Sequence, residues 1–177
     1  AAVLGLDDQV ILDICQNVAA GVVEAVNFNS PGQVVIAGTV AAVDAAIVAC
    51  KEAGAKRAMP LPVSAPFHTS LMQPAGVKLA EKIAGLELLS PQIPVVHNVH
   101  AQTESDPAKI KELLVQQIYS PVKWVSCVET MVAAGIEQTV ECGPGKVLGG
   151  LNRRIQKSLS VFALEDTAGF DKALAEL

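Results

Sequence analysis

Along the first 62 residues, hydrophobic positions recur either at helical spacing or in the short runs typical of strands. The first helical stretch begins after Asp7 or Asp8, which is expected to cap it. Its apolar positions are Ile11, Ile14, Cys15 and Val18. The whole pattern predicts strands at residues 1–6, 21–28, 33–37 and 55–61, and helices at residues 8–18 and 39–53. This βαββαβ order is that of a ferredoxin-like unit, a small antiparallel sheet backed by two helices.

From residue 63 onward, helical and extended patterns alternate. Helices are expected at residues 70–84, 107–119, 125–134, 146–158 and 167–177, and strands at residues 93–97, 135–141 and 159–163. Alternating strands and helices indicate a parallel sheet with helices on both faces. The sequence therefore predicts an α/β protein of two units, a ferredoxin-like unit in residues 1–62 and a parallel-sheet unit in residues 63–177.

Composition excludes several functions. Hydrophobic residues make up 51% and charged residues 18% of the 177 positions, which is enough for a substantial core. The net charge of −5 argues against nucleic-acid binding, because phosphate contacts need concentrated Lys and Arg. The cysteines are far apart, without a Cys-x-x-Cys pair, so we expect small buried side chains in a reducing, cytoplasmic setting. They are Cys15, Cys50, Cys127 and Cys142.

The best candidate for chemistry is His68, which follows the proline-bounded extended run at residues 59–63. A helix that Thr69 or Ser70 is expected to cap comes directly after it. Junctions between strands and helices are where α/β enzymes hold catalytic side chains, and a histidine exchanges protons near neutral pH. From this segment alone, a structural histidine at a helix start is an equally good interpretation.

Five segments extend the pattern well beyond His68. They read Val-Asn-Phe-Asn-Ser-Pro-Gly-Gln-Val-Val-Ile-Ala-Gly at 26–38, Gly-Ala-Lys-Arg-Ala at 54–58, Pro-Phe-His at 66–68, Gln-Ile-Tyr-Ser-Pro-Val-Lys-Trp at 117–124 and Glu-Cys-Gly-Pro-Gly-Lys-Val-Leu at 141–148. In this order and spacing the chain resembles the malonyl-CoA:acyl carrier protein transacylases of bacterial fatty-acid synthesis. It resembles the acyltransferase domains of polyketide synthases more distantly. The resemblance implies that residues 63–177 are the C-terminal portion of an α/β-hydrolase-like domain.

Three features of that family are absent, and the most important is its nucleophile motif. Its nucleophile is a serine within Gly-His-Ser-x-Gly, and no Gly-x-Ser-x-Gly occurs in these 177 residues. The family's carboxylate-binding arginine and its N-terminal Gly-Gln-Gly segment are also missing. We therefore expect the C-terminal part of such an enzyme, with the nucleophile on a missing N-terminal part. On its own this chain is expected to be inactive.

The resemblance also implies roles for individual residues. His68 matches the general base and acid of a ping-pong transfer of malonyl from malonyl-CoA to the phosphopantetheine thiol of acyl carrier protein. Gln117 matches the position whose backbone carbonyl orients this histidine. Phe67 matches the Phe-His pair of malonyl-selective relatives, with a core phenylalanine as the alternative. Asn27 and Asn29, two apart on one strand, are expected to share a face and line the pocket, although a turn explains Asn29 equally well.

Acyl carrier proteins are acidic, so the resemblance implies a basic docking surface. Two clusters match basic positions of the family, Lys56 with Arg57 and Arg153 with Arg154. For any one of these residues, a solvated charged face is the safer interpretation. We expect no cofactor and no metal. The alternative function is a non-catalytic fragment that serves as a carrier-protein docking or structural module.

Two further motifs have weak functional interpretations. His97 and His100 have His-x-x-His spacing, but they lie where a strand runs into a polar loop, so we expect surface histidines. Residues 143–146, Gly-Pro-Gly-Lys, lack the full pattern of a phosphate loop and are expected to form a tight turn. A hydrolase that uses Ser64 or Ser70 as its nucleophile would need a strand-turn-helix elbow, which the sequence around them does not contain.

Overall fold

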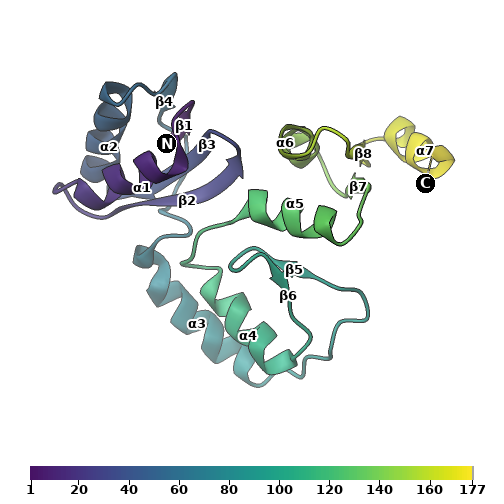
Figure 1. Ribbon diagram of the computed structural model, residues 1–177. Helices are drawn as coiled ribbons and strands as arrows, with labels where there is room; N and C mark the ends of the chain where they lie inside the picture. Colours follow the sequence, from purple (N-terminus) through teal and green to yellow (C-terminus); the bar gives the residue numbers. More distant parts are fainter. Residues whose placement is uncertain (177) are drawn as a thin grey trace.

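The N-terminal 59 residues form a four-stranded antiparallel sheet with two helices on one face, at the purple end of the chain in Figure 1. The computed structural model describes residues 1–176. The elements are β1 (Ala2–Leu4), α1 (Asp8–Asn17), β2 (Val23–Ser30), β3 (Gln33–Gly38), α2 (Val40–Glu52) and β4 (Arg57–Met59). The strand order β2-β3-β1-β4, with all neighbours antiparallel, is that of a ferredoxin-like unit, so the predicted topology is confirmed.

Alternation along the strands builds the core of this unit. Val3 of β1 and both Val34 and Ile36 of β3 are fully buried. They pack with Ile11 of α1 and the small side chains of α2 in one cluster drawn entirely from residues 1–58. The opposite face of the sheet is therefore the one available to the rest of the chain.

Two register shifts interrupt the pairing of β2 with β3, one before Asn27 and one after Phe28. Between them β2 turns main-chain groups toward the second unit. The Phe28 amide donates to the Val122 carbonyl oxygen over 3.0 Å, and the Val122 amide donates to the Val26 carbonyl oxygen over 2.8 Å. This single parallel bridge joins the ferredoxin-like unit to the second unit.

The second unit begins with one 3₁₀ turn, η1 (Ser70–Met72), which continues directly into α3 (Gln73–Ala84). α3 packs against α4 (Pro107–Gln116), and the two lie side by side in Figure 1. α5 (Trp124–Ala133) lies at the centre of the molecule, where it contacts β2, β5 (Val96–His97) and the later helix α6 (Val147–Ile155).

The strand predicted at residues 93–97 is shorter and has a different partner. β5 (Val96–His97) pairs antiparallel with β6 (Gln102–Thr103), which the sequence does not predict. The chain turns back at Ala101, whose φ is 58° and whose amide donates to the His97 carbonyl oxygen over 2.8 Å. Because the chain reverses so soon, β5 forms a small hairpin and does not join a parallel sheet.

The predicted parallel pairing is found between β7 (Gln138–Glu141) and β8 (Ser160–Ala163), which are connected through α6 (Val147–Ile155). The last helix, α7 (Thr167–Glu176), packs against β8. Within residues 1–176, β7 has no strand on its other side. The parallel sheet of this unit therefore has two strands here, and neither outer edge pairs with a further strand, although parallel sheets are normally covered and wider.

Three of the four cysteines are buried, as predicted: Cys15, Cys50 and Cys127. Burial raises the pKa of the Cys15 thiol to about 12. Cys142 is exposed, so the prediction of a buried side chain is wrong there. It lies just after β7, at the start of the irregular bend that leads to α6.

Candidate functional site

His68 lies in an irregular connector, residues 60–69, between β4 and η1. The predicted boundary between the two units, after residue 62, falls in the same connector. The φ of His68 is 64°, in the left-handed region. This conformation is unfavourable for a residue with a Cβ, although histidine adopts it more readily than most. Such a backbone persists where contacts on both sides hold it.

The first of these contacts is at the end of α4. His68 Nδ1 is 2.8 Å from the carbonyl oxygen of Gln117, the C-cap residue of that helix. A carbonyl oxygen can only accept, so Nδ1 carries the proton of the neutral ring and Nε2 keeps its lone pair. The carbonyl is available because the last carbonyls of a helix lack intrahelical partners. The contact that the resemblance implies is thus present, and it leaves Nε2 able to accept a proton.

The second contact shows that the predicted capping of the following helix is wrong. The Thr69 hydroxyl donates to the Pro66 carbonyl oxygen over 2.6 Å and makes no capping hydrogen bond. The Ser70 amide instead donates to the carboxylate of Glu24 on β2, at 3.1 Å from Oε2 and 3.3 Å from Oε1. The Ser70 hydroxyl also donates to Glu24 Oε1. Sequence reasoning misses Glu24, and the only signal for it is a carboxylate inside the apolar run at residues 22–26.

The predicted pocket residues lie on two parts of the chain: Phe67 is in the connector, and Asn27 and Asn29 are on β2. Phe67 is 48% exposed, so the alternative of a core phenylalanine is wrong. Asn27 lies at the bridge to Val122, where the two units meet. Asn29 lies at the second register shift of β2, and the rule that puts residues i and i+2 on one face does not hold across a bulge.

The two basic clusters are only partly brought together. Arg154 Nη1 donates to Gln33 Oε1 of β3 over 2.7 Å, whereas Arg153 turns to β8 and donates to a carbonyl oxygen there. Leu4 of β1 pairs with Gln33 on one side and with Arg57 on the other. Paired residues share a face and strands are about 4.8 Å apart, so Arg57 and Gln33 lie about 10 Å apart on one face. That face carries Arg57 and the Arg154 contact but not Arg153.

Lys56 precedes β4, and its aliphatic chain lies against the backbone of Gly5. A Cβ at Gly5 would come within 2.7 Å of the Lys56 Cγ, so this packing depends on the glycine. The Lys56 residue is otherwise exposed, as expected when an aliphatic stem is covered and the ammonium stays in water.

The turn at residues 143–146 does not offer an open anion site. Glu141, the last residue of β7, accepts the Leu148 amide at Oε1 over 3.1 Å and the Gly149 amide at Oε2 over 2.8 Å. These amides belong to the first turn of α6, and in a phosphate loop the corresponding groups hold the phosphate. Here a carboxylate of the chain itself already binds them.

Of the two histidines in the His-x-x-His pair, only His100 is exposed at the surface. His100 is exposed and its Nδ1 accepts the Gln102 amide, as predicted for a surface histidine. His97 is partly buried, its Nε2 has no hydrogen-bond partner, and burial lowers its pKa. Across residues 1–176, no three His, Cys, Asp or Glu side chains are grouped so that they could hold a metal ion. None of the helices in that range is long and apolar enough to span a membrane.

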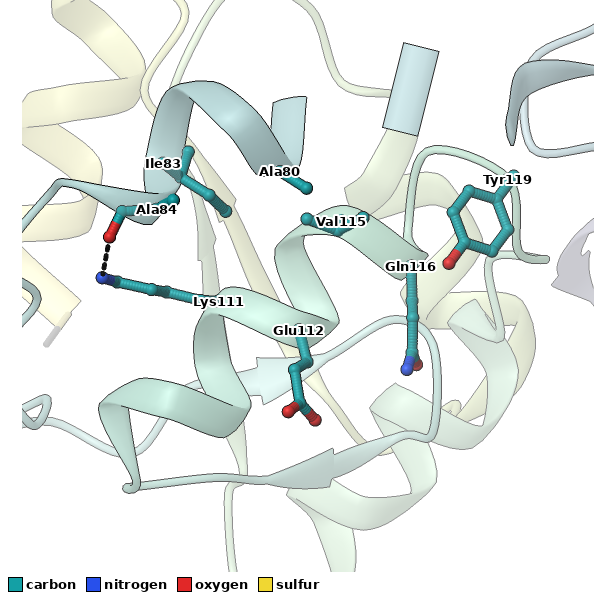
Figure 2. A pocket seen from close by; sticks show the side chains of 8 residues that line it. All are labelled: Ala80, Ile83, Ala84, Lys111, Glu112, Val115, Gln116 and Tyr119. Atoms are coloured by element: carbon teal, nitrogen blue, oxygen red, sulfur yellow. Dashed lines mark hydrogen bonds between the residues drawn. The ribbon is translucent and has the colours of Figure 1, made fainter. Parts of the chain in front are cut away.

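A groove of about 310 Å³ lies between α3 and α4, and Figure 2 shows the side chains that line it. Ala80 and Ile83 contribute its apolar α3 side, and Tyr119 lies at one end. On the α4 side, Lys111 reaches across and donates to the Ala84 carbonyl oxygen over 3.3 Å. His68 does not line this groove, so the groove is separate from the histidine site.

No family model matches this chain. It is 51% identical, over 99% of its length, to the malonyl CoA-acyl carrier protein transacylase of Salmonella typhimurium. The crystal structure of an acyl-carrier-protein S-malonyltransferase from Burkholderia pseudomallei matches 98% of the chain with a TM-score of 0.95 and 52% identity. A type II PKS acyl-carrier protein in complex with its malonyl-transacylase matches 99% of it with a TM-score of 0.97 and 48% identity.

The fold and these neighbours place the chain in the class of α/β-hydrolase-like proteins that carry a ferredoxin-like unit. Within this class, the chain is a homologue of the malonyl CoA-acyl carrier protein transacylases, as the sequence resemblance predicts. It spans about 57% of the length of these relatives.

Proposed function

We propose that these residues are part of an enzyme that transfers malonyl from malonyl-CoA to the phosphopantetheine thiol of acyl carrier protein. The observation that carries this proposal is the 48% identity and TM-score of 0.97 to a malonyl-transacylase in complex with an acyl-carrier protein. The free thiols of the chain suit a reducing, cytoplasmic setting for this reaction.

In the proposed mechanism, Nε2 of His68 takes the proton of a serine hydroxyl as that oxygen attacks the malonyl thioester. The serine belongs to a part of the enzyme outside this chain. The thioester C–S bond breaks and His68 returns the proton to the coenzyme A thiolate. The carrier-protein thiol then gives its proton to His68 and attacks the malonyl-serine ester, and the serine oxygen is reprotonated. The Gln117 carbonyl holds the ring in the tautomer that these steps require.

Phe67 is proposed to select malonyl over a bulkier acyl group. Phe67 directly precedes His68 and is half exposed, and its ring is proposed to occupy the space that an α-methyl group needs. A contact of this kind is worth only about 1–3 kcal/mol, so it sets a preference and not an absolute limit. Asn27 and Asn29 are proposed as further substrate contacts. The position of Asn27 at the junction of the two units supports it better than the bulge position of Asn29.

The acidic carrier protein is proposed to dock on the basic residues of both units: Lys56, Arg57, Arg153 and Arg154. The shared sheet face of Arg57 and the Arg154–Gln33 contact supports this for two of them. Because Arg153 is engaged with β8, its contribution to docking is expected to be smaller.

Radiolabelled malonyl-CoA tests whether the serine nucleophile lies outside this chain while His68 lies within it. The 177-residue chain alone should remain unlabelled on a denaturing gel, because it contains no Gly-x-Ser-x-Gly nucleophile. Co-expression with a polypeptide that supplies the remainder of the enzyme should give label on that second polypeptide and transfer to the carrier protein. The matched control is the same pair with His68→Ala, which should accumulate little label.

Stoichiometric labelling of the 177-residue chain alone would contradict the proposal, because the nucleophile would then be in this sequence. Failure of a correctly assembled pair to load malonyl would contradict the substrate assignment.

A further inference from the structure

We infer that Glu24 is a positioning residue for His68, acting across the junction between the ferredoxin-like unit and the second unit. The inference deepens the proposed function and rests on the role of His68 as proton acceptor. Glu24 touches no reacting group in this arrangement. It acts through the two residues that follow the histidine.

Three hydrogen bonds carry the inference. Both carboxylate oxygens of Glu24 accept the Ser70 amide, at 3.1 and 3.3 Å, and one of them also accepts the Ser70 hydroxyl. Ser70 is the first residue of η1, which continues into α3, so the carboxylate lies at the N-terminus of a long helical segment. An anion is favoured there by the free amides and by the helix dipole.

The Glu24 contact holds the backbone on the C-terminal side of His68, at Ser70, whereas the Gln117 carbonyl oxygen holds the His68 ring itself. Thr69, which lies between His68 and Ser70, is fully buried, and its hydroxyl donates to the Pro66 carbonyl oxygen. A residue with a φ of 64° returns to an extended or helical backbone when its neighbours are free to move. If Ser70 were released, His68 would rotate away from the Gln117 carbonyl oxygen, and the Nδ1-protonated tautomer would lose its stabilising partner.

The residues next to the helix start do not cap the helical segment at Ser70 with their own side chains. The Thr69 hydroxyl bonds backward to Pro66, and neither Thr69 nor Met72 caps the helical segment with its side chain. The carboxylate therefore replaces a local cap with one from the other unit. This choice couples the orientation of His68 to the position of β2.

The test uses three variants and one control: Glu24→Ala, Glu24→Gln, Ser70→Ala and Glu52→Ala. Glu52 is an exposed glutamate of α2 in the same unit, so it controls for loss of one charge. Two measurements are made on each variant. The first is the protonation of the His68 ring nitrogens by ¹⁵N NMR of the 177-residue chain, assigned by comparison with His68→Gln. The second is malonyl loading by the whole enzyme, with kcat and KM for malonyl-CoA determined separately.

Glu24→Ala should shift His68 from the Nδ1-protonated form to a mixture of tautomers. It should also lower kcat by about 10- to 100-fold, the usual cost of a misplaced catalytic group, with KM unchanged. Glu24→Gln keeps an acceptor for the Ser70 groups and should recover part of the loss. Ser70→Ala removes only the hydroxyl bond and should act in the same direction more weakly.

The remaining outcomes are decisive in different ways. Unchanged tautomer and unchanged kcat would overturn the inference, and so would a loss of kcat with no change in tautomer. A changed tautomer with normal loading would leave Glu24 as a positioning residue but contradict His68 as the base of the proposed function. If Glu24→Ala does not fold, absence of any tautomer shift in both Glu24→Gln and Ser70→Ala overturns the inference.

Discussion

At the scale of single residues, the unfavourable backbone conformation of His68 accompanies a specific contact of its ring. Its left-handed φ turns the chain sharply between an irregular connector and a helix. The ring then meets the Gln117 carbonyl oxygen at the end of a different helix. Because a main-chain group makes this contact, the identity of the side chain at position 117 has little influence on it.

The first prediction follows from that distinction. In the whole enzyme, His68→Ala should lower malonyl transfer by about 10²- to 10⁴-fold, the usual contribution of a positioned proton-transfer group. Gln117→Ala should leave transfer nearly unchanged, because the carbonyl oxygen is kept. Steady-state kinetics with malonyl-CoA and carrier protein would check both. Near-normal turnover of His68→Ala would make the histidine structural, and a severe loss in Gln117→Ala would assign the role to its side chain.

The residues of the site differ in how well the sequence predicts them. His68 and Gln117 stand within recognisable motifs, so the resemblance indicates both, and their contact is present. Glu24 lies 46 residues from its partner Ser70 and belongs to no motif, so only the tertiary structure brings them together. The expected local cap at Thr69 is wrong because the Thr69 hydroxyl donates to the carbonyl oxygen of Pro66, three residues earlier in the chain.

At the scale of elements, α6 depends on a carboxylate from the strand before it. Glu141 binds two amides in the first turn of α6, whose preceding residue, Lys146, makes no side-chain cap. The same contact ties β7 to α6 across the bend at residues 142–146. The carboxylate therefore serves as the cap that this helix otherwise lacks.

We predict that Glu141→Ala lowers the free energy of unfolding by about 0.5–2 kcal/mol, the range measured for loss of a side-chain cap. Glu141→Gln should lose less, because an amide oxygen can still accept one hydrogen bond but carries no charge for the helix dipole. Chemical denaturation of the 177-residue chain would measure both, with Glu137→Ala, an exposed glutamate just before β7, as the control. Equal stability of Glu141→Ala and Glu137→Ala would contradict the capping role.

The elements of the first unit are easier to predict than those of the second. Alternating burial in β1 and β3 and the capping residue Asp7 are local features, and the predicted order of elements is confirmed. The bulges of β2 lie on either side of the main-chain bridge to Val122, which no local pattern indicates. The β5–β6 hairpin has two residues per strand, too few for a periodic signal.

At the scale of the whole molecule, few polar contacts within residues 1–176 connect the two units. They are the bridge between Asn27 and Val122, the Glu24 contact with Ser70 and the Arg154 contact with Gln33. The first unit has its own buried core, whereas β7 of the second unit has an open edge within residues 1–176. The first unit is therefore the more self-contained of the two.

The last prediction separates carrier-protein docking from chemistry. Arg57 and Arg154 are placed on one face by the strand register and the Gln33 contact, so reversing both charges should weaken an acidic partner's approach. In the whole enzyme, the double variant Arg57→Glu and Arg154→Glu should raise KM for the carrier protein, and the effect should shrink as salt is added. Malonyl loading from malonyl-CoA should be unchanged.

The matched control is Lys51→Glu with Lys78→Glu, which makes the same change in net charge at exposed positions on α2 and α3. This control should alter KM for the carrier protein far less, because docking depends on where the charges lie and not only on their sum. If the two double variants raised KM for the carrier protein equally, docking would depend on the net charge of the chain and not on these two positions. Loss of loading together with transfer would assign Arg57 and Arg154 to folding or to coenzyme A binding, since a surface that meets only the carrier protein has no part in the first half-reaction.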